Sequence, residues 1–445
     1  MIDKLIQDNN SRIELLIARL GELRNPDGGF KGYHIYDANS GLWTTAEITH
    51  IVAKSQCGKE KNWLRPACEY IADNQNTDGG WGFRAGGKSI TDITAWACLA
   101  LSHLSYTETI RSGVEFILQA RRNEGDENED GWGLTTFEPD RVYSTWVASY
   151  ALGRLLPQFC RESDSEGDLY LCQQMRTALS EAKSWLLQNK NTDGGWGAMK
   201  NEPSKYTSTA VALLTLFMQG EDPKEFDDSC DFLRSGQEDN LWELGREVVI
   251  TREGYELPQE WFTSAFCLRA FIFFAEMNVV SLEEIDNVHT NFVDLIDANG
   301  DVRPSRAASP DLVWTIPYML EALDKYNEFL KSKRSPYGKF LQKKAREAGE
   351  RKKAEVKHLL YQQYPYPISQ VFSQYEHEID FHRRFQLTLQ VYEVAIKYVA
   401  IVCLAGSIAA RETLAEVQEL LQEGFKKPSL GAWARLLEEI LKKTL

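Results

Sequence analysis

Two kinds of hydrophobic segment alternate along the first three quarters of the chain. In residues 63–72, apolar side chains recur at steps of three and four, which predicts an amphipathic helix with one exposed face. In residues 95–101 nearly every side chain is apolar, which predicts a helix that is buried on all sides. We therefore expect pairs of an outer, half-exposed helix and an inner, enclosed helix.

A glycine-rich turn with the pattern Asp-Gly-Gly-Trp separates the two helices of each pair. Clear copies occupy residues 27–30, 78–81, 130–132 and 193–196, and weaker copies occupy residues 239–242 and 299–302. Glycine ends a helix readily because it adopts the left-handed backbone conformation that other residues resist. A turn repeated in this way indicates one helical hairpin that is used many times.

In the second pair, the polar residues 91–94 suit N-capping of the inner helix. The inner helices are predicted to begin near residues 44–46, 93–95, 144–146, 208–210, 263–265 and 314–316. They give six hairpins between residue 1 and about residue 327. The predicted fold is all-α, a six-hairpin α/α toroid (an α6/α6 barrel), with an open superhelix of helix pairs as the alternative.

The turn sequences carry a family resemblance. Residues 75–82, which read Gln-Asn-Thr-Asp-Gly-Gly-Trp-Gly, and residues 188–197 resemble the Gln-Trp repeat of the prenyltransferase and squalene-cyclase repeat family. The resemblance covers residues 1–327 and implies the terpenoid-cyclase toroid. It does not fix a reaction, because the same toroid also serves proteins without isoprenoid chemistry.

Alignment of the six inner-helix starts predicts which side chains surround one mouth of a closed toroid. The aligned positions are Trp43, Asp92, Tyr143, Thr207, Phe262 and Val313, and Trp146 and Trp314 follow closely in the sequence. We expect a ligand-binding cavity lined by Trp43, Asp92, Tyr143, Trp146, Thr207, Phe262 and Trp314. An aromatic wall around a single carboxylic acid suits protonation of an alkene and shielding of the resulting carbocation.

Asp92 is the candidate catalytic acid. Cyclases of this family that begin by protonation carry the motif Asp-x-Asp-Asp-Thr-Ala, whose middle Asp is the acid, and the resemblance places Asp92 at that position. Ile90 and Ile93 stand where the family has the flanking carboxylates that keep the acid protonated. Asp is also a common N-cap residue, so a purely structural role for Asp92 stays open.

A zinc site is a second candidate. The zinc-binding protein prenyltransferases of this family use Asp-x-Cys and a later His, and Asp228 and Cys230 match the first part. Phe262 stands near the place of the His, and two ligands do not make a zinc site. His377 and His382 are five residues apart, off a shared helical face, and are predicted to be solvated. We therefore expect neither a metal nor a cofactor.

Composition and charge bear on location and partners. Eight cysteines, most among apolar neighbours, predict buried thiols in a reducing compartment, and no N-terminal signal is visible. The longest apolar run, residues 398–410, is too short to span a bilayer. These features predict a cytoplasmic protein without a membrane span. The acidic net charge of -15 makes nucleic acid an unexpected partner of the toroid.

The charge changes sign near the end of the toroid. From residue 331 onward, 20 Lys and Arg residues face 13 Asp and Glu residues. We predict three parts: the toroid (1–327), a basic helical linker (328–354) and a small helical bundle (355–445). The bundle loosely resembles a helical module of multidomain bacterial signalling or defence proteins, which implies a protein partner through the bundle or the toroid cavity.

Three functions follow from these features. The favoured interpretation is a non-catalytic or regulatory binding or scaffold protein, whose toroid holds an apolar, isoprenoid-like ligand or part of a protein. The first alternative is an isoprenoid-handling cyclase with Asp92 as general acid. The second alternative is a zinc-dependent protein prenyltransferase, which lacks its His ligand.

Overall fold

The structure is a computed structural model that describes residues 2–58, 61–121, 130–135, 138–161, 166–250 and 256–362. The chain forms two compact units, residues 1–340 and 341–445. Helix α13 (Arg334–Gln362) begins in the first unit and continues into the second. Apart from the end of α13, the predicted bundle, with His377 and His382, lies outside the described residues.

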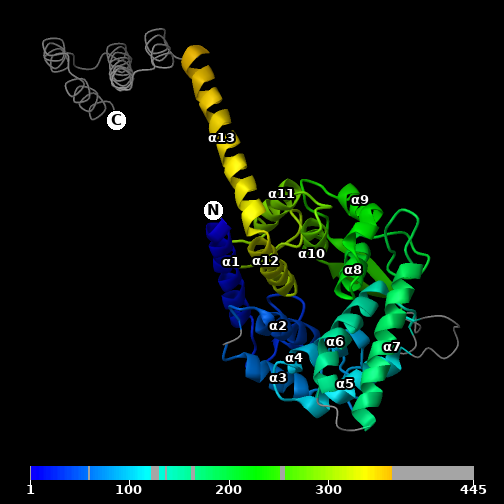
Figure 1. Cartoon of the computed structure of the whole chain (residues 1–445). Helices are drawn as coiled ribbons and strands as arrows, with labels where there is room; N and C mark the ends of the chain where they lie inside the picture. The colour runs from blue at the N-terminus through cyan, green and yellow to red at the C-terminus, as the bar shows by residue number, and fades with distance from the viewer. Residues whose placement is uncertain are drawn as a thin grey trace, which may run out of the picture. The chain divides into compact units, whose positions relative to one another are not determined.

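The first unit is a ring of helical hairpins (Figure 1). Its inner helices are α2 (Leu42–Lys54), α4 (Thr91–Leu101), α6 (Val142–Arg161), α8 (Tyr206–Met218), α10 (Thr263–Glu276) and α12 (Thr315–Ser332). Its outer helices are α1 (Ile2–Glu22), α3 (Leu64–Asp73), α5 (Thr107–Ala120), α7 (Glu166–Gln188), α9 (Asp227–Ser235, after the short 3-10 helix η1, Pro223–Phe226) and α11 (Leu282–Val293). Every residue of α4 is buried, whereas α3 buries a single stripe. The prediction of an all-α, six-hairpin toroid is confirmed.

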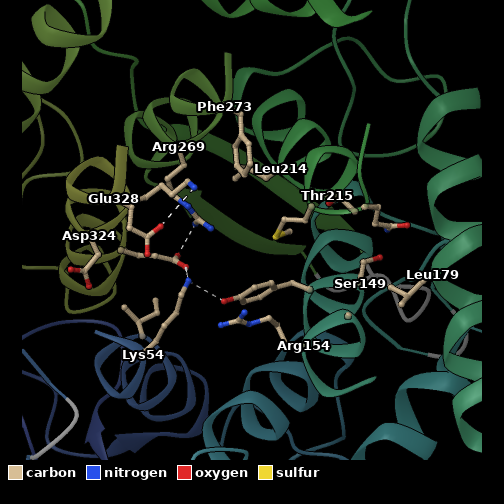
Figure 2. A pocket seen from close by; sticks show the side chains of 17 residues that line it. Lys54, Ser149, Arg154, Leu179, Leu214, Thr215, Arg269, Phe273, Asp324 and Glu328 are labelled. Carbon is tan, nitrogen blue, oxygen red and sulfur yellow. Dashed lines mark hydrogen bonds and ion pairs between the residues drawn. The ribbon is translucent and has the colours of Figure 1, made fainter. Parts of the chain in front are cut away.

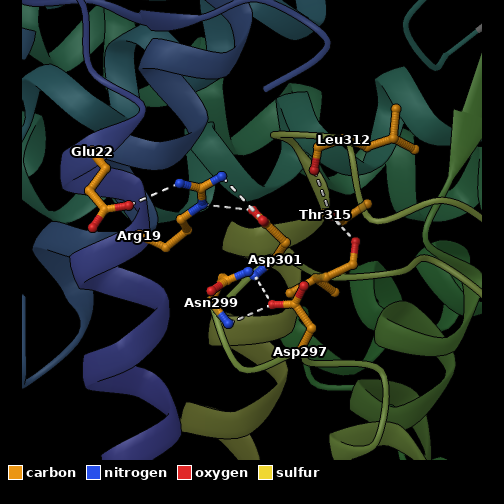
Figure 3. Close-up of polar contacts among 8 residues, drawn as sticks. Arg19, Glu22, Asp297, Asn299, Asp301, Leu312 and Thr315 are labelled. Atoms are coloured by element: carbon orange, nitrogen blue, oxygen red, sulfur yellow. Dashed lines mark hydrogen bonds and ion pairs between the residues drawn. The ribbon is translucent and has the colours of Figure 1, made fainter. Parts of the chain in front are cut away.

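The ring is closed. Helix α12 contacts α10 on one side and α2 on the other, and α1 packs against α12. The sixth turn also contacts the first outer helix, as Figure 3 shows: Arg19 donates from Nε and Nη2 to the two carboxylate oxygens of Asp301 at 2.7 and 3.1 Å. These contacts join the two ends of the repeat and exclude the open superhelix.

The backbone geometry of the turn explains why the same residues recur in it. Gly79 has a φ of 85°, and a Cβ on it would lie 2.5 Å from the carbonyl oxygen of Ser112 in the next outer helix. Only glycine fits such a left-handed position in close contact with a neighbouring backbone. Asp78 Oδ1 accepts a hydrogen bond from the amide of Gly80 at 3.0 Å and so stabilises the turn.

In the second, third and fourth turns, a tryptophan connects the outer helix to its inner helix. Trp81 donates from Nε1 to the carbonyl of Ile71 in α3 at 2.7 Å, and its amide donates to Thr94 Oγ1 in α4 at 3.0 Å. The same two bonds recur at Trp132 and Trp196. Trp81 is fully buried, so its two N–H groups need acceptors within the protein. The two bonds thereby hold the start of α4 against α3.

Two antiparallel strand pairs accompany the helices. β1 (Phe30–Lys31) pairs with β2 (Ser40–Gly41), and β3 (Gly245–Ile250) pairs with β4 (Glu256–Trp261). The second pair follows the fifth turn and leads directly into α10, so it lies at the end of the ring where the inner helices begin. The sequence prediction does not contain this hairpin.

A disulfide joins Cys160 of α6 to Cys172 of α7. Helix α6 is the inner helix of one hairpin and α7 is the outer helix of the next, and the prediction of buried thiols for most of the cysteines does not contain this pair. The described Cys68, Cys98 and Cys230 are buried free thiols, as is Cys267. None of the helices that the structure describes is long and apolar enough to cross a membrane.

Candidate functional site

Asp92 lies in the first turn of α4, at the mouth where the inner helices begin. Its side chain is only 7% exposed, and Oδ1 has no hydrogen-bond partner. The N-cap of α4 is Ile90, and no side chain caps the helix. Asp92 is therefore not the N-cap of α4 and lies instead as an acidic residue in the first turn of the helix.

The surroundings of Asp92 favour its protonated form. Burial raises the pKa of the carboxyl to about 6, against the opposing charge of Arg141 and the nearby hydroxyl of Ser144. The carboxylate of Glu247 adds to the rise. Desolvation thus raises the pKa of Asp92 although positions 90 and 93 hold isoleucine and carry no carboxylate.

The β3–β4 hairpin occupies the mouth beside Asp92. Arg141, which is 2% exposed, donates from Nη2 to Glu247 Oε1 and to Gln259 Oε1, both at 2.9 Å. The ring of Trp261 at the end of β4 lies 4.0 Å from that of Tyr143, centroid to centroid. These contacts leave a gap of only about 10 Å³, which Tyr143, Thr207 and Trp261 help to line.

An aromatic layer lies below the mouth. Trp146 packs edge-on against Tyr143, Trp96 and Phe266, at centroid distances of 5.3, 5.9 and 5.4 Å. The hydroxyls of Tyr143 and Tyr318 share a hydrogen bond of 2.9 Å across the ring. Burial raises the pKa of both tyrosines well above the ordinary value, so the layer is neutral.

A second buried acid, Glu47 of α2, lies near this layer. Burial raises its pKa to about 8, and the neighbouring Tyr318 hydroxyl opposes the rise without meeting the geometry of a hydrogen bond. Neither carboxyl oxygen has a hydrogen-bond partner. The sequence signal for Glu47 is that it is the one acidic residue in helix α2.

The open cavity of the toroid lies toward the opposite mouth, where the inner helices end (Figure 2). Its volume is about 650 Å³. Glu321 of α12 pairs there with Lys54 of α2 at 3.1 Å and with Arg269 of α10 at 2.7 Å. Arg269 stands alone in an apolar segment of α10, which is a sequence signal that could have found it.

The seven predicted cavity residues lie in different parts of the toroid. Asp92, Tyr143, Trp146 and Thr207 lie at or below the filled mouth, and none of the seven predicted residues lines the open cavity. Phe262 stacks on Phe292 of α11 at 5.4 Å, so it faces an outer helix. Trp314 packs against Tyr33 and Tyr318, and Trp43 is half-buried. Ligand contact by any of the seven stays a prediction.

The two residues of the partial zinc motif, Asp228 and Cys230, make contacts unrelated to metal binding. Asp228 accepts a hydrogen bond from Lys190 Nζ at 2.7 Å, and Cys230 is buried in α9. Within the part of the chain that the structure describes, no three His, Cys, Asp or Glu side chains gather as metal ligands.

Sequence comparisons match the toroid to two family models. The squalene-hopene cyclase C-terminal domain matches residues 5–154, a segment that contains Asp92, and the prenyltransferase alpha-alpha toroid domain matches residues 168–241. The chain is 27% identical over 195 residues to a drimenyl diphosphate synthase of Streptomyces showdoensis, which is 43% of this chain and 33% of that protein. A second drimenyl diphosphate synthase, from Streptantibioticus cattleyicolor, is 26% identical over 222 residues, or 49% of this chain and 38% of that protein. The chain thus spans about a third of the length of these relatives.

Solved structures agree on the fold. The type II terpene cyclase MstE from Scytonema, in complex with merosterolic acid A as product, superimposes with a TM-score of 0.52 at 14% identity and covers 74% of this chain and all of that chain. Its apo form gives a TM-score of 0.51 at 16% identity, over 73% of this chain and 99% of that chain. At this identity the likeness concerns the fold alone. The chain therefore carries an α/α toroid, in which residues 5–154 match the squalene-hopene cyclase C-terminal domain and residues 168–241 match the prenyltransferase toroid domain.

Proposed function

We propose that the toroid is an isoprenoid-handling enzyme of the terpene-cyclase type, in which Asp92 donates the proton that starts cyclisation. The observation that carries the proposal is the state of Asp92: a buried carboxyl with a pKa of about 6 and an unpartnered oxygen, beside an aromatic layer. The relatives named drimenyl diphosphate synthase support an isoprenoid substrate class. The non-catalytic interpretation has no such support.

The chemistry assigned to Asp92 is a single proton transfer. The carboxyl proton moves to one carbon of an alkene, the π electrons form the new C–H bond, and the other carbon becomes a carbocation. A second alkene of the same molecule then closes a ring onto this cation, and loss of a proton ends the reaction. Neutral rings such as those of Tyr143, Trp146 and Trp96 stabilise a cation through their π faces.

Access to Asp92 requires the hairpin to move. The gap of about 10 Å³ holds no isoprenoid chain while Trp261 rests on Tyr143. The contacts of Arg141 with Glu247 and Gln259 are the bonds that opening would break. We expect substrate binding to displace β4 from the mouth.

The proposal is tested by incubating the whole chain with farnesyl diphosphate and geranylgeranyl diphosphate and analysing products by gas chromatography and mass spectrometry. We expect cyclic products, and we expect Asp92→Asn to lower their rate about a thousandfold, within the range of a general acid. Asp228→Asn is the matched control, because Asp228 also lies in the first turn of a helix but on the outside of the ring. Cyclic products formed equally fast by Asp92→Asn would exclude the proposed role.

A further inference from the structure

A chain of hydrogen-bonded side chains connects an exposed histidine to the open cavity. Nε2 of His103, which is exposed just after α4, lies 3.2 Å from Nδ1 of His50 in α2. Nε2 of His50 lies 3.0 Å from the hydroxyl of Tyr150 in α6. Lys54 Nζ lies 3.3 Å from the same hydroxyl, and Figure 2 marks this contact with a dashed line. Tyr150 and Lys54 both line the open cavity.

The middle of this chain is buried, whereas its ends are accessible. His50 is 2% exposed and Tyr150 is 5% exposed, but the side chain of Lys54 at the cavity is 37% exposed. Burial lowers the pKa of His50 well below its ordinary value, so its imidazole is neutral and holds one proton. The nitrogen that holds this proton sets the direction of the hydrogen bonds on both sides of the ring.

Two groups that cannot reverse fix this direction when His103 is neutral. The ammonium group of Lys54 only donates, so the oxygen of Tyr150 accepts from it. The carbonyl of Leu99, 3.3 Å from Nδ1 of His50, only accepts, which places the His50 proton on Nδ1. Nε2 of His50 is then an acceptor and receives the hydroxyl proton of Tyr150. In this state Tyr150 has no proton to donate into the cavity.

The charged groups that act on His50 are Lys54 of its own helix, Glu321 of α12 and, once protonated, His103. Arg269 of α10 pairs with the other oxygen of Glu321. Although burial opposes both charges, Glu321 raises the pKa of Lys54, and Arg269 and Lys54 lower the pKa of Glu321 to about 2. Lys54 and Glu321 therefore keep their charges between pH 5 and 8, and His103 is the titratable ring that contacts His50 directly.

Protonation of His103 reverses the hydrogen bonds of the chain. An exposed imidazole gains its second proton below about pH 6.5, and both of its nitrogens are then donors. The new N–H at Nε2 of His103 faces the N–H at Nδ1 of His50, 3.2 Å away, which is repulsive. The repulsion ends when the His50 proton moves from Nδ1 to Nε2. The carbonyl of Leu99 still has a donor in this state, because Ser102 Oγ donates to it at 2.7 Å.

We propose that protonation of His103 makes Tyr150 a hydrogen-bond donor to a ligand in the open cavity. After the reversal, His50 Nε2 and Lys54 Nζ both donate to the oxygen of Tyr150. The hydroxyl proton of Tyr150 then needs another acceptor, which a ligand oxygen supplies. The inference is separate from the proposed cyclase function, because Asp92 has no part in it.

The cavity determines the class of this ligand. Its volume of about 650 Å³ lies within the range of small-molecule sites, about 300 to 1,000 Å³. Leu214 and Phe273 give it apolar surface (Figure 2). The charge next to Tyr150 is already balanced, since Lys54 pairs with Glu321 at 3.1 Å. These surroundings suit a neutral molecule with an acceptor oxygen, such as a ketone, and an apolar body.

NMR of the whole chain, labelled with ¹⁵N in its histidine rings, tests the reversal between pH 5 and 8. Protonated and unprotonated ring nitrogens differ widely in ¹⁵N chemical shift, so the spectrum reports the tautomer of each ring. We expect the His50 proton to move from Nδ1 to Nε2 as His103 gains its proton, with one common midpoint. Spectra of His50→Gln and His103→Gln assign the signals. A His50 ring that keeps its proton on Nδ1 throughout would overturn the proposal.

A pair of variants shows whether His103 is the trigger. His103→Gln should remove the pH-dependent change at His50, because glutamine does not titrate. His34→Gln is the matched control, since His34 is also partly exposed and contacts an acid, Asp311, at 3.7 Å, but is not part of the chain. This control should leave the change at His50 as it is in the unmodified protein. A change that persists in His103→Gln would contradict the assigned trigger.

Isothermal titration calorimetry with 2-octanone tests the cavity end of the chain, because a ketone oxygen only accepts. We expect binding about fivefold tighter at pH 5.5 than at pH 8, which corresponds to about 1 kcal/mol for one added hydrogen bond. Tyr150→Phe and His103→Gln should each remove this difference. Equal affinity at the two pH values, or no binding of the ketone at either, would overturn the assigned role of Tyr150 in the cavity.

Discussion

The two mouths of the toroid are built from the same six inner helices but contain different side chains. The mouth at the helix N-termini is closed by the β3–β4 hairpin and holds an unpartnered acid, Asp92, beside aromatic rings. The mouth at the helix C-termini is open and holds the ion network of Lys54, Arg269 and Glu321. A layer of aromatic side chains around Trp146 lies in the ring.

This difference shows that the repeat builds the ring but does not determine its chemistry. The turns at Gly79 and Trp81 recur in other hairpins with the same bonds, whereas the charged residues of both mouths occur once each. The hairpin is likewise inserted in one repeat only among the described residues. The chemistry of such a ring therefore depends on residues and insertions that the other repeats do not share.

The largest effect is expected at Glu47, near the aromatic layer. Its raised pKa of about 8 means that the folded protein keeps a proton that the unfolded chain has lost above about pH 4.5. This contribution to stability is complete below pH 4.5 and declines as the pH rises to 8, by at most about 4 kcal/mol between pH 5 and 8. Glu47→Gln should remove this decline. Urea unfolding of both proteins across this pH range measures it, and parallel curves would contradict the buried, protonated state.

The second prediction concerns the closed mouth. Trp261→Ala should cost about 3 kcal/mol of folding free energy, because it removes a large buried ring from its contact with Tyr143. It should also raise kcat/KM for the isoprenoid substrate by opening access to Asp92. Tyr36→Ala, at a side chain that is 66% exposed, is the control for stability. A stable variant with unchanged kcat/KM would show that the hairpin does not obstruct the mouth.

The third prediction concerns the pH dependence of turnover. Only the protonated form of Asp92 donates a proton, and its pKa is about 6. The rate constant kcat/KM should therefore fall about tenfold per pH unit well above this value, so that activity at pH 8 is about fiftyfold lower than at pH 6, where half of Asp92 is protonated. Initial rates from pH 5 to 9 measure the profile. Activity that rises with pH would require a base in place of an acid.

The smallest effect is expected in the open mouth. Although burial alone would raise it, Arg269 and Lys54 lower the pKa of Glu321 to about 2. Arg269→Met should lower the free energy of unfolding by about 2 kcal/mol at pH 7. The loss is smaller than for a buried carboxylate with one partner, because Lys54 still pairs with Glu321. The stabilisation by ionised Glu321 is present above about pH 4.5 and is lost as the pH falls toward 2, so the difference between the two proteins should shrink with acid. Arg154→Met, at the exposed rim, should change stability by less than about 0.5 kcal/mol.

The fold could be predicted from the sequence because its signals are local and repeated. Asp78, Gly79 and Trp81 specify the turn, and Thr94 specifies the start of the inner helix, with the same spacing in other repeats. The hairpin has a sequence signal as well, the β-branched run at residues 248–251 before Gly254.

The contents of the two mouths could be predicted only in part. Asp92 and Tyr143 follow from alignment of the helix starts, but Phe262 at the aligned position turns toward an outer helix. The pairing of Glu321 with Lys54 joins residues 267 positions apart, so it depends on closure of the ring. Which mouth is open depends on the packing of Trp261, which the repeat pattern does not contain.

The most direct test of the acid role of Asp92 is the isotope content of the product formed in D₂O. The carboxyl proton of Asp92 exchanges with solvent, so protonation of the alkene should place one deuterium on the carbon that is protonated first. We predict a cyclic product with one deuterium from the unmodified chain and almost no product from Asp92→Asn. A cyclic product without deuterium, or the same deuterated product from Asp92→Asn at an equal rate, would contradict this role.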